Sequence, residues 1–310
     1  MSVEVIAARC PLCGPEFEGR SVASSVDFEY GTTGAQEFRF VQCAACACIL
    51  LHPRPVDDAI ASLYPPEYEP YRFDTLPPLV RAGRDWTQRK KVKLVREYAG
   101  DNAFIVDVGC GAGTLLRLLR AQGPSGWQLC GWDYPGPHMR VLAESGFAVV
   151  EGPIDEAHVP SGVDVFILNQ VIEHFPFPAD ILEALSKALK PGGTIVIETP
   201  DIGGLDRSWF QSRHWGGYHT PRHMVLFNQQ NLSQLVERCG LQVVSTDRLA
   251  SPAFWIQSLH HTAAEAKFKK LAAVCTLRNL PLVAAFSAFD LARRNFGSTS
   301  NQRLVARKPS

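Results

Sequence analysis

The chain has 310 residues, of which 46% are hydrophobic and 20% are charged, and its acidic and basic residues balance. This composition excludes a disordered or fibrous protein, and the length predicts two domains or one large domain with an appendage. The charge is uneven, because residues 1–80 hold five Lys and Arg against eleven Asp and Glu, whereas residues 261–310 hold nine against two. Phosphate binding needs clustered Lys and Arg, so we expect no nucleic-acid partner for the acidic part.

The first residues and the cysteine count predict a protein of a reducing compartment. Glu4 follows Met1 closely and no long apolar core comes after it, so we expect no secretory signal and a cytoplasmic location. The chain contains nine cysteines. Without a secretory signal, we interpret them first as thiols or metal ligands and only then as disulfides.

Two Cys-x-x-Cys pairs, at residues 10–13 and 43–46, flank a strand-rich segment. This is zinc-ribbon spacing, because each pair can form a tight knuckle that aims two sulfurs at one ion. Cys48 and His52 lie close enough in sequence to replace one ligand. A module over residues 1–55 is too short to be stabilised by apolar burial alone, so the metal would supply much of its folding free energy. We predict a structural Zn²⁺ site with four thiolate ligands: Cys10, Cys13, Cys43 and Cys46.

Residues 56–99 are predicted to form a linker and a helix. Prolines and tyrosines crowd the stretch from Tyr64 to Tyr71, which predicts an extended segment. For its tyrosines we favour ordinary packing over a place at a substrate mouth. A helix over residues 79–99 carries a run of cations that predicts a solvated face: Arg89, Lys90, Lys91, Lys93 and Arg96.

A strand, a glycine turn and a helix follow over residues 104–120. Phe104–Val108 is short, apolar and rich in β-branched residues, which predicts a buried strand. The glycines at positions 109, 111 and 113 allow a tight turn, and the helix behind them presents free N–H groups. The third glycine comes one residue earlier than in the dinucleotide fingerprint G-x-G-x-x-G. Asp107 at the strand end would repel a pyrophosphate and suits a ligand that carries an amino group.

This Asp-x-Gly-x-Gly-x-Gly motif resembles motif I of the class I S-adenosylmethionine-dependent methyltransferases. Asp133 stands twenty residues beyond Gly113, where an α/β nucleotide site holds the ribose hydroxyls. The pair Glu173–His174 and the turn Lys190–Gly193 also resemble this family. The resemblance implies S-adenosylmethionine as cosubstrate, bound by Asp107, Gly109, Cys110, Gly111, Gly113, Asp133, Tyr134, Ile154 and Asn169.

The fold class that follows is α/β, with a Rossmann-like seven-stranded sheet, helices on both faces, and a small N-terminal zinc ribbon. Residues 100–310 would form this methyltransferase domain, with strands at 104–108, 128–133, 147–150, 163–168, 194–198 and 241–246. The family usually ends on a seventh, antiparallel strand, for which residues 302–307 are the best candidate. About residues 250–297 would then be a helical insertion before the last strand, with two helices broken near Pro281.

The insertion contains two nearly apolar runs, Leu271–Leu277 and Leu282–Phe289, with cations at their flanks. Each run is too short to span a bilayer. An apolar surface with basic flanks can make a peripheral contact with an anionic membrane, cap the active site or form a dimer face. The sequence does not specify the oligomeric state.

Four side chains are candidates for the reaction itself. Open α/β sheets bind ligands at the carboxyl ends of their strands, where Glu173 and His174 follow the fourth strand and His219 and His223 follow the fifth. A hydroxyl acceptor must lose a proton as it attacks the methyl carbon, and His has a suitable pKa to take it. We predict His174 as the base, with Glu173, His223 and His219 as further candidates.

These observations predict an S-adenosylmethionine-dependent methyltransferase that acts on a small-molecule acceptor, by O- or C-methylation of a lipid or a specialised metabolite. The zinc module resembles that of certain sugar C-methyltransferases, and the core resembles ubiquinone-pathway O-methyltransferases. Two other classes stay open. A nicotinamide-dependent oxidoreductase is disfavoured by Asp107 and the early Gly113, and an RNA-modifying or non-catalytic zinc-ribbon protein by the acidic N-terminal segment.

Overall fold

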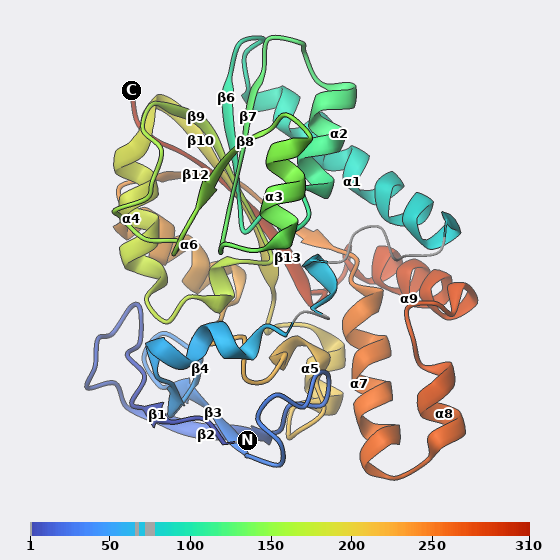
Figure 1. Cartoon of the computed structure of the whole chain (residues 1–310). Helices are drawn as coiled ribbons and strands as arrows, with labels where there is room; N and C mark the ends of the chain where they lie inside the picture. The colour runs from blue at the N-terminus through green and yellow to red at the C-terminus, as the bar shows by residue number, and fades with distance from the viewer. Residues whose placement is uncertain (1, 66–67, 72–77) are drawn as a thin grey trace.

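A seven-stranded sheet forms the centre of the computed structural model, which describes residues 2–65, 68–71 and 78–310 (Figure 1). The strand order is β12-β13-β10-β9-β6-β7-β8, and only β13 runs antiparallel to its neighbours. The sheet confirms the predicted fold class and the antiparallel last strand, which lies between the fifth and sixth strands. The strands are β6 (Phe104–Val108), β7 (Gln128–Asp133), β8 (Ala148–Glu151), β9 (Val163–Asn169), β10 (Leu189–Pro200), β12 (Gln242–Leu249) and β13 (Asn301–Arg307).

Helices cover both faces of this sheet, which is why its inner strands are apolar at nearly every position. On one face pack α1 (Pro78–Tyr98) and α2 (Thr114–Gln122), against alternate residues of β6 and β9. On the other face pack α4 (Pro178–Ala188) and α6 (Gln229–Arg238). A further helix, α3 (Pro137–Glu144), lies beside β7 and β8.

The N-terminal part forms two small sheets below the large one in Figure 1. One pairs β1 (Val5–Ile6) with β5 (Arg54–Pro55). The other has the order β11-β4-β3-β2, built from β2 (Gly19–Ser25), β3 (Phe38–Cys43), β4 (Ile49–Leu51) and β11 (Val225–Leu226). Because β11 comes from the later part of the chain, the N-terminal sheet is completed by a segment from beyond the predicted 1–55 module. The division at residues 55 and 99 therefore stays a prediction.

The C-terminal insertion holds three helices and not the two that the sequence predicted. They are α7 (Pro252–Glu265), α8 (Lys269–Val274) and α9 (Leu280–Arg293). The prediction rested on the two most apolar runs, whereas α7 mixes apolar and polar residues and buries Phe254, Trp255 and Ile256. Pro281 starts α9 instead of breaking it, since proline is tolerated in the first turn of a helix. Within the described residues, no helix is long and apolar enough to cross a membrane.

Candidate active site

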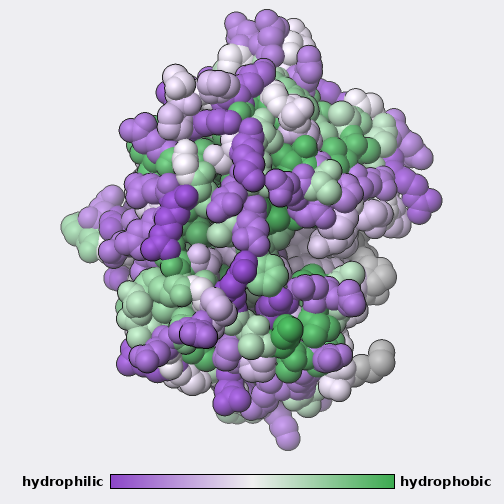
Figure 2. Space-filling model, turned by 90° about the vertical axis from the view of Figure 1, so that its left-hand side faces the viewer, coloured by the Kyte–Doolittle hydropathy of each residue, from purple (hydrophilic) through white to green (hydrophobic). Residues whose placement is uncertain are grey.

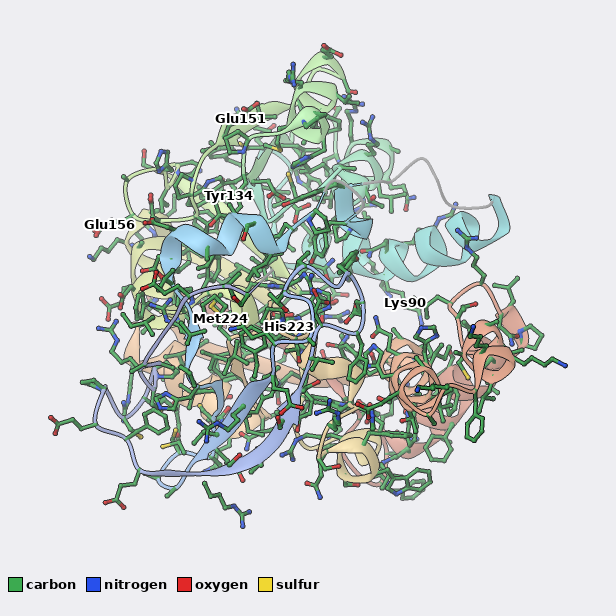
Figure 3. The ribbon with its side chains drawn as sticks, turned by 60° about the horizontal axis from the view of Figure 1, so that its bottom comes forward. Lys90, Tyr134, Glu151, Glu156, His223 and Met224 are labelled. Carbon is green, nitrogen blue, oxygen red and sulfur yellow. The ribbon has the colours of Figure 1, made fainter. Side chains whose placement is uncertain are left out.

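A cavity of about 410 Å³ opens at the carboxyl ends of β6, β7 and β9. Apart from Gly113 and Glu173, every cofactor-binding and catalytic residue predicted from the sequence lines it. Further walls come from the segment around η1 (Asp57–Leu63) and η2 (Glu69–Tyr71), the loop that contains η5 (Gly216–Tyr218), and the helices α1, α2 and α7. Figure 3 shows Tyr134 and His223 in the middle of the molecule, whereas Glu151 and Glu156 lie toward its outside.

The glycine turn after β6 needs glycine at each of its three positions. Gly109, Gly111 and Gly113 have φ angles of 66°, 52° and 75°, and residues with a side chain rarely adopt such positive values. A Cβ on Gly109 would lie 2.6 Å from Val171, and one on Gly111 would lie 2.6 Å from the Pro70 carbonyl oxygen. The turn therefore presents bare backbone, and Gly113 serves as the N-cap of α2 behind the cavity wall.

Asp133 fixes this turn against the end of β7. Its Oδ2 accepts a hydrogen bond from the backbone N–H of Gly111, and its Oδ1 accepts one from Tyr134, both at 2.7 Å. Burial raises the pKa of Asp133 to about 6, against the lowering effect of these bonds. Ile154, which is 8% exposed, lines the wall nearby. Cys110 is buried with its Sγ 3.7 Å from Met139 Sδ, and burial raises its pKa well above the usual value.

Asp107 faces the cavity as a buried carboxyl group. It is 4% exposed, and no Lys, Arg or His nitrogen of the described chain lies within 4 Å of it. Burial raises the pKa of Asp107 to about 7, although Lys91 partly opposes this. Lys91 itself pairs with Glu198 at 2.6 Å and donates to Asn169 Oδ1 at 2.5 Å. The prediction of a solvated cationic face is therefore wrong for Lys91, whose ammonium group is held by polar side chains at the ends of β9 and β10.

The tyrosines that we expected to serve ordinary packing line the cavity. Tyr64, Tyr68 and Tyr71 form a chain of edge-on rings with centroids 5.0 and 5.2 Å apart. Tyr71 also stacks on His138 at 4.1 Å, and the Pro70 carbonyl accepts from the backbone N–H of Ala112 at 3.0 Å. This segment therefore covers the glycine turn. The crowding of these tyrosines in the sequence was the available signal for a place in the cavity wall, since tyrosine combines an apolar ring with a polar tip.

Three histidines meet in the cavity wall, next to Tyr64 and Tyr68. The ring centroids of His174 and His223 lie 4.7 Å apart, and those of His219 and His223 lie 4.9 Å apart. His174 ends the short helix η4 (Ile172–His174) after β9, while His219 caps η5 in the left-handed region. Two loops at the sheet's carboxyl edge thus bring the predicted histidines together.

His219 is bound by a carboxylate that the sequence argument did not find. Its Nδ1 lies 2.7 Å from Glu29 Oε1, and Glu29 belongs to the turn between β2 and β3. Burial alone would raise the pKa of Glu29, but the charge and hydrogen bond of His219 outweigh it and lower the pKa to about 2. The interaction joins residues 190 positions apart, so no local motif could reveal it.

A buried ion pair fixes the same turn in place. Arg222 and Asp27 have fully buried side chains whose charged atoms lie 3.0 Å apart. Arg222 also donates from Nε to the Leu63 carbonyl at 2.8 Å and lies over the Tyr30 ring. The lowered pKa of Asp27 reflects this guanidinium, which overcomes the effect of burial. Arg222 thus ties the N-terminal sheet and η1 to the histidine loop.

Glu173 lies behind the histidines and is fully buried. Its Oε2 accepts from Thr199 Oγ1 at 2.9 Å, while its Oε1 has no hydrogen-bond partner among the described residues and lies 3.7 Å from His223 Nε2. Burial raises the pKa of Glu173 to about 8. His223 is held through Nδ1 by the Gly217 carbonyl, so a protonated Glu173 would face its free Nε2. Together with His174, these residues are also close enough to hold a metal ion.

Burial makes His174 and His223 poor bases. It lowers the pKa of His223 to about 3 and that of His174 well below the usual value. His174 Nδ1 is also engaged by the Tyr64 hydroxyl at 2.9 Å. The geometry therefore favours His219, with its carboxylate partner, over His174, which the sequence argument ranked first.

The four predicted zinc ligands converge at the N-terminal sheet. Their Sγ atoms all lie within 4.8 Å of one another, and those of Cys10 and Cys46 are 3.4 Å apart. Sulfurs around one tetrahedral Zn²⁺ stand roughly 3.8 Å apart, so the arrangement fits the ion. His52 accepts through Nδ1 from Ala8 and is not part of this set, and neither is the buried Cys48. The ion itself stays a prediction.

Comparison with known proteins agrees with this geometry. A family model described as a methyltransferase domain matches residues 83–246. The ubiquinone biosynthesis O-methyltransferase of Idiomarina loihiensis is 27% identical over 47% of this chain and 64% of its own length. The trans-aconitate 2-methyltransferase of Streptomyces avermitilis is 24% identical over 53% of this chain and 58% of its own length. The chain thus spans about half to two thirds of these relatives.

Among solved structures, a SAM-dependent methyltransferase from Archaeoglobus fulgidus is similar over 73% of this chain and 94% of that one, with 17% identity and a TM-score of 0.48. The cyclopropane synthase MmaA2 from Mycobacterium tuberculosis is similar over 71% and 84%, with 16% identity and a TM-score of 0.49. The family model covers more than half of the chain, from α1 to β12, and includes the glycine turn, Asp107 and Asp133. The chain belongs to the class I S-adenosylmethionine-dependent methyltransferases.

Proposed function

We propose that the protein transfers a methyl group from S-adenosylmethionine to a hydroxyl group of a small-molecule acceptor. One observation carries this proposal: a single cavity holds Asp107, beside a turn of bare backbone, and His219, bound to a buried carboxylate. The first group suits a donor with a positively charged amino-acid tail, and the second suits an acceptor that must lose a proton.

The donor half of the cavity offers a group for each part of the cosubstrate. Asp107 would bind the ammonium group, whose charge favours the ionised carboxylate and would lower the raised pKa of Asp107. Asp133 keeps further lone pairs for the ribose hydroxyls, although both of its oxygens already accept backbone hydrogen bonds. Tyr134 and Ile154 would flank the adenine. Gly109, Cys110 and Gly111 would contact the ligand through their backbone atoms. The side chain of Asn169 is held in place by a hydrogen bond from Lys91.

When bound, the sulfonium donor supplies an electrophilic methyl carbon. His219 would accept the proton of the acceptor hydroxyl at Nε2, because Nδ1 is occupied by Glu29. Glu29 would stabilise the imidazolium that results, and it would hold the ring in one orientation. The oxygen forms its bond to the methyl carbon as the carbon–sulfur bond breaks. The chain's main remaining contribution is alignment, since direct displacement needs acceptor and donor close and in line.

The walls around the histidines favour an acceptor with both a flat apolar part and a hydroxyl group. Tyr64, Tyr68 and Phe175 provide rings, and the Tyr64 hydroxyl and His174 form a polar pair among them. Two of the relatives are named as ubiquinone biosynthesis O-methyltransferases, which supports oxygen over carbon as the acceptor atom. The zinc site lies outside this cavity and would be structural, because four thiolates leave no open position.

Calorimetry with the purified protein tests the cosubstrate. We expect S-adenosylmethionine and S-adenosylhomocysteine to bind, and NADH not to bind. A donor labelled in its methyl group, incubated with hydroxyl-bearing metabolite fractions, should then give products that are heavier by one labelled methylene group. Binding of a nicotinamide dinucleotide without binding of either sulfur compound would overturn the proposal.

A further inference from the structure

The outward sides of α8, α9 and the turn after α9 expose a large apolar surface. In the described chain eleven large hydrophobic side chains are exposed, and six of them lie between residues 268 and 296. We call this set the arm surface: Phe268, Leu271, Val274, Phe289, Leu291 and Phe296. In Figure 1 these helices stand beside the two sheets, on the side opposite α4 and α6. Figure 2 shows the molecule from the side of α4 and α6. That face is mostly hydrophilic, with small separate hydrophobic groups.

The helix α9 is unusual for a helix at a surface. Its residues from Leu280 to Phe289 include no charged side chain, and several of them are exposed. A helix that is apolar on all sides is normally buried in a core or a membrane. Among the described residues its main packing partner is α7, where Phe286 stacks on Trp255 at 5.3 Å.

The unpaired charges around the arm surface are all positive among the described residues. Lys267, Lys269, Lys270, Arg278 and Arg294 are exposed, and none has a carboxylate within 4 Å among the described residues. Of the two acids in the region, Asp290 is buried, and Glu265 is exposed but already paired. Asp290 accepts from Trp255 Nε1 and from the backbone N–H of Ser251, and Glu265 pairs with Arg213 and His214. The arm surface therefore presents apolar groups and unpaired cations together.

We infer that the arm surface binds the surface of an anionic lipid bilayer. Apolar side chains would enter the boundary between headgroups and acyl chains, and the cations would contact lipid phosphates. Lysine is suited to this place, because its stem lies along apolar groups while its ammonium reaches the polar layer. Contact would be peripheral, since no described helix is both long and apolar enough to span a bilayer.

Two protein partners fit the arm surface less well. A second copy, placed by a two-fold axis, would bring the same five cations against each other, and the exposed acid of the region, Glu265, is already paired with Arg213 and His214 of its own chain. The centre of a protein–protein interface is also depleted of lysine. Here Lys267, Lys269 and Lys270 stand directly beside Phe268 and Leu271, so the cations cannot be confined to a rim.

The arm surface is joined firmly to the cavity. The helix α7 lines the cavity through Phe254 and Gln257, and its Trp255 packs against Phe286 and Phe289 of α9. Binding through α8 and α9 would therefore hold the cavity at a fixed orientation to the bilayer. The inference itself needs no methyl transfer, so it stands or fails independently of the proposed function.

Co-sedimentation of the full chain with lipid vesicles tests this inference. The vesicles contain phosphatidylcholine alone or phosphatidylcholine mixed with phosphatidylglycerol, and no methyl donor is added. We expect binding to the anionic vesicles only, weakened by added salt because exposed charges are screened. The triple variant Lys267→Glu, Lys269→Glu, Lys270→Glu should bind at least about tenfold more weakly.

A matched triple variant reverses the same number of exposed cations elsewhere: Arg20→Glu, Arg140→Glu and Lys187→Glu. It should keep vesicle binding, and Phe268→Ser with Phe296→Ser should lose it although the net charge is unchanged. Unchanged thermal midpoints show that each variant folds. Equal loss in both triple variants, binding to neither vesicle at low salt, or self-association that the lysine reversal abolishes would overturn the inference.

Discussion

The two halves of the cavity are built in different ways. The donor half comes from one short stretch, in which a strand, a glycine turn and the end of the next strand bring Asp107 and Asp133 together. The acceptor half needs three distant segments, because His219 meets Glu29, and Arg222 meets both Asp27 and Leu63. A binding site for a common cosubstrate can thus be local, whereas the part that selects the acceptor is assembled by tertiary contacts.

Removal of the zinc site should separate the two halves most strongly. In the variant Cys10→Ser, Cys13→Ser we expect turnover to be abolished, because the metal would stabilise the sheet that carries Asp27 and Glu29. Binding of S-adenosylmethionine should remain measurable by calorimetry, since no zinc ligand lines the cavity. Cys275→Ala, which changes a buried cysteine of the insertion, is the control. Full turnover in a zinc-free protein would contradict this prediction.

Substitution of His219 should affect the acceptor half alone. We expect His219→Ala to lower kcat by about 10²- to 10⁴-fold, which is the usual contribution of a general base. Glu29→Gln should lower it less, because the ring remains while its carboxylate partner is lost. Cosubstrate affinity should stay near the original value in both variants, as measured by calorimetry.

His158 lies outside the cavity and also pairs with an acid, Asp155. His158→Ala is therefore a matched control and should keep full activity. If His219→Ala were fully active while His174→Ala were not, His174 would be the base and the ranking taken from the sequence would stand.

Asp107→Asn should weaken only the donor half. Loss of a charge-assisted hydrogen bond predicts about 10- to 100-fold weaker cosubstrate binding. With a pKa of about 7, Asp107 is neutral below that pH, so affinity should fall as pH drops through 7. The asparagine variant should lack this pH dependence. The raised pKa also means that the ligand-free protein binds this proton more tightly than the unfolded chain does. Its stability should therefore decrease as pH rises from about 4 to 7.

The sequence predicted the sheet and the donor half because their signals are short. Alternating glycines, an acid at a strand end and apolar strands are each visible within ten residues. It predicted that His174, His219 and His223 would lie at the same edge of the sheet, since the carboxyl ends of parallel strands share one edge. It could not identify Glu29, Asp27 or the direction of Tyr64, because these depend on how the N-terminal sheet packs. It misjudged Lys91, which lies on α1, because the burial of this side chain depends on a distant contact with Glu198 of β10.

The strand β13 has a consequence for how the chain is made. It lies between β10 and β12, and β12 reaches the rest of the sheet only through it. Until residues 301–307 leave the ribosome, one edge of β10 therefore carries a row of unpaired backbone N–H and C=O groups, and β12 has no strand to pair with. Open edges of this kind recruit other chains. Synthesis halted within α7–α9 would thus produce an aggregation-prone fragment, even though it would already contain the glycine turn and both acids of the donor half.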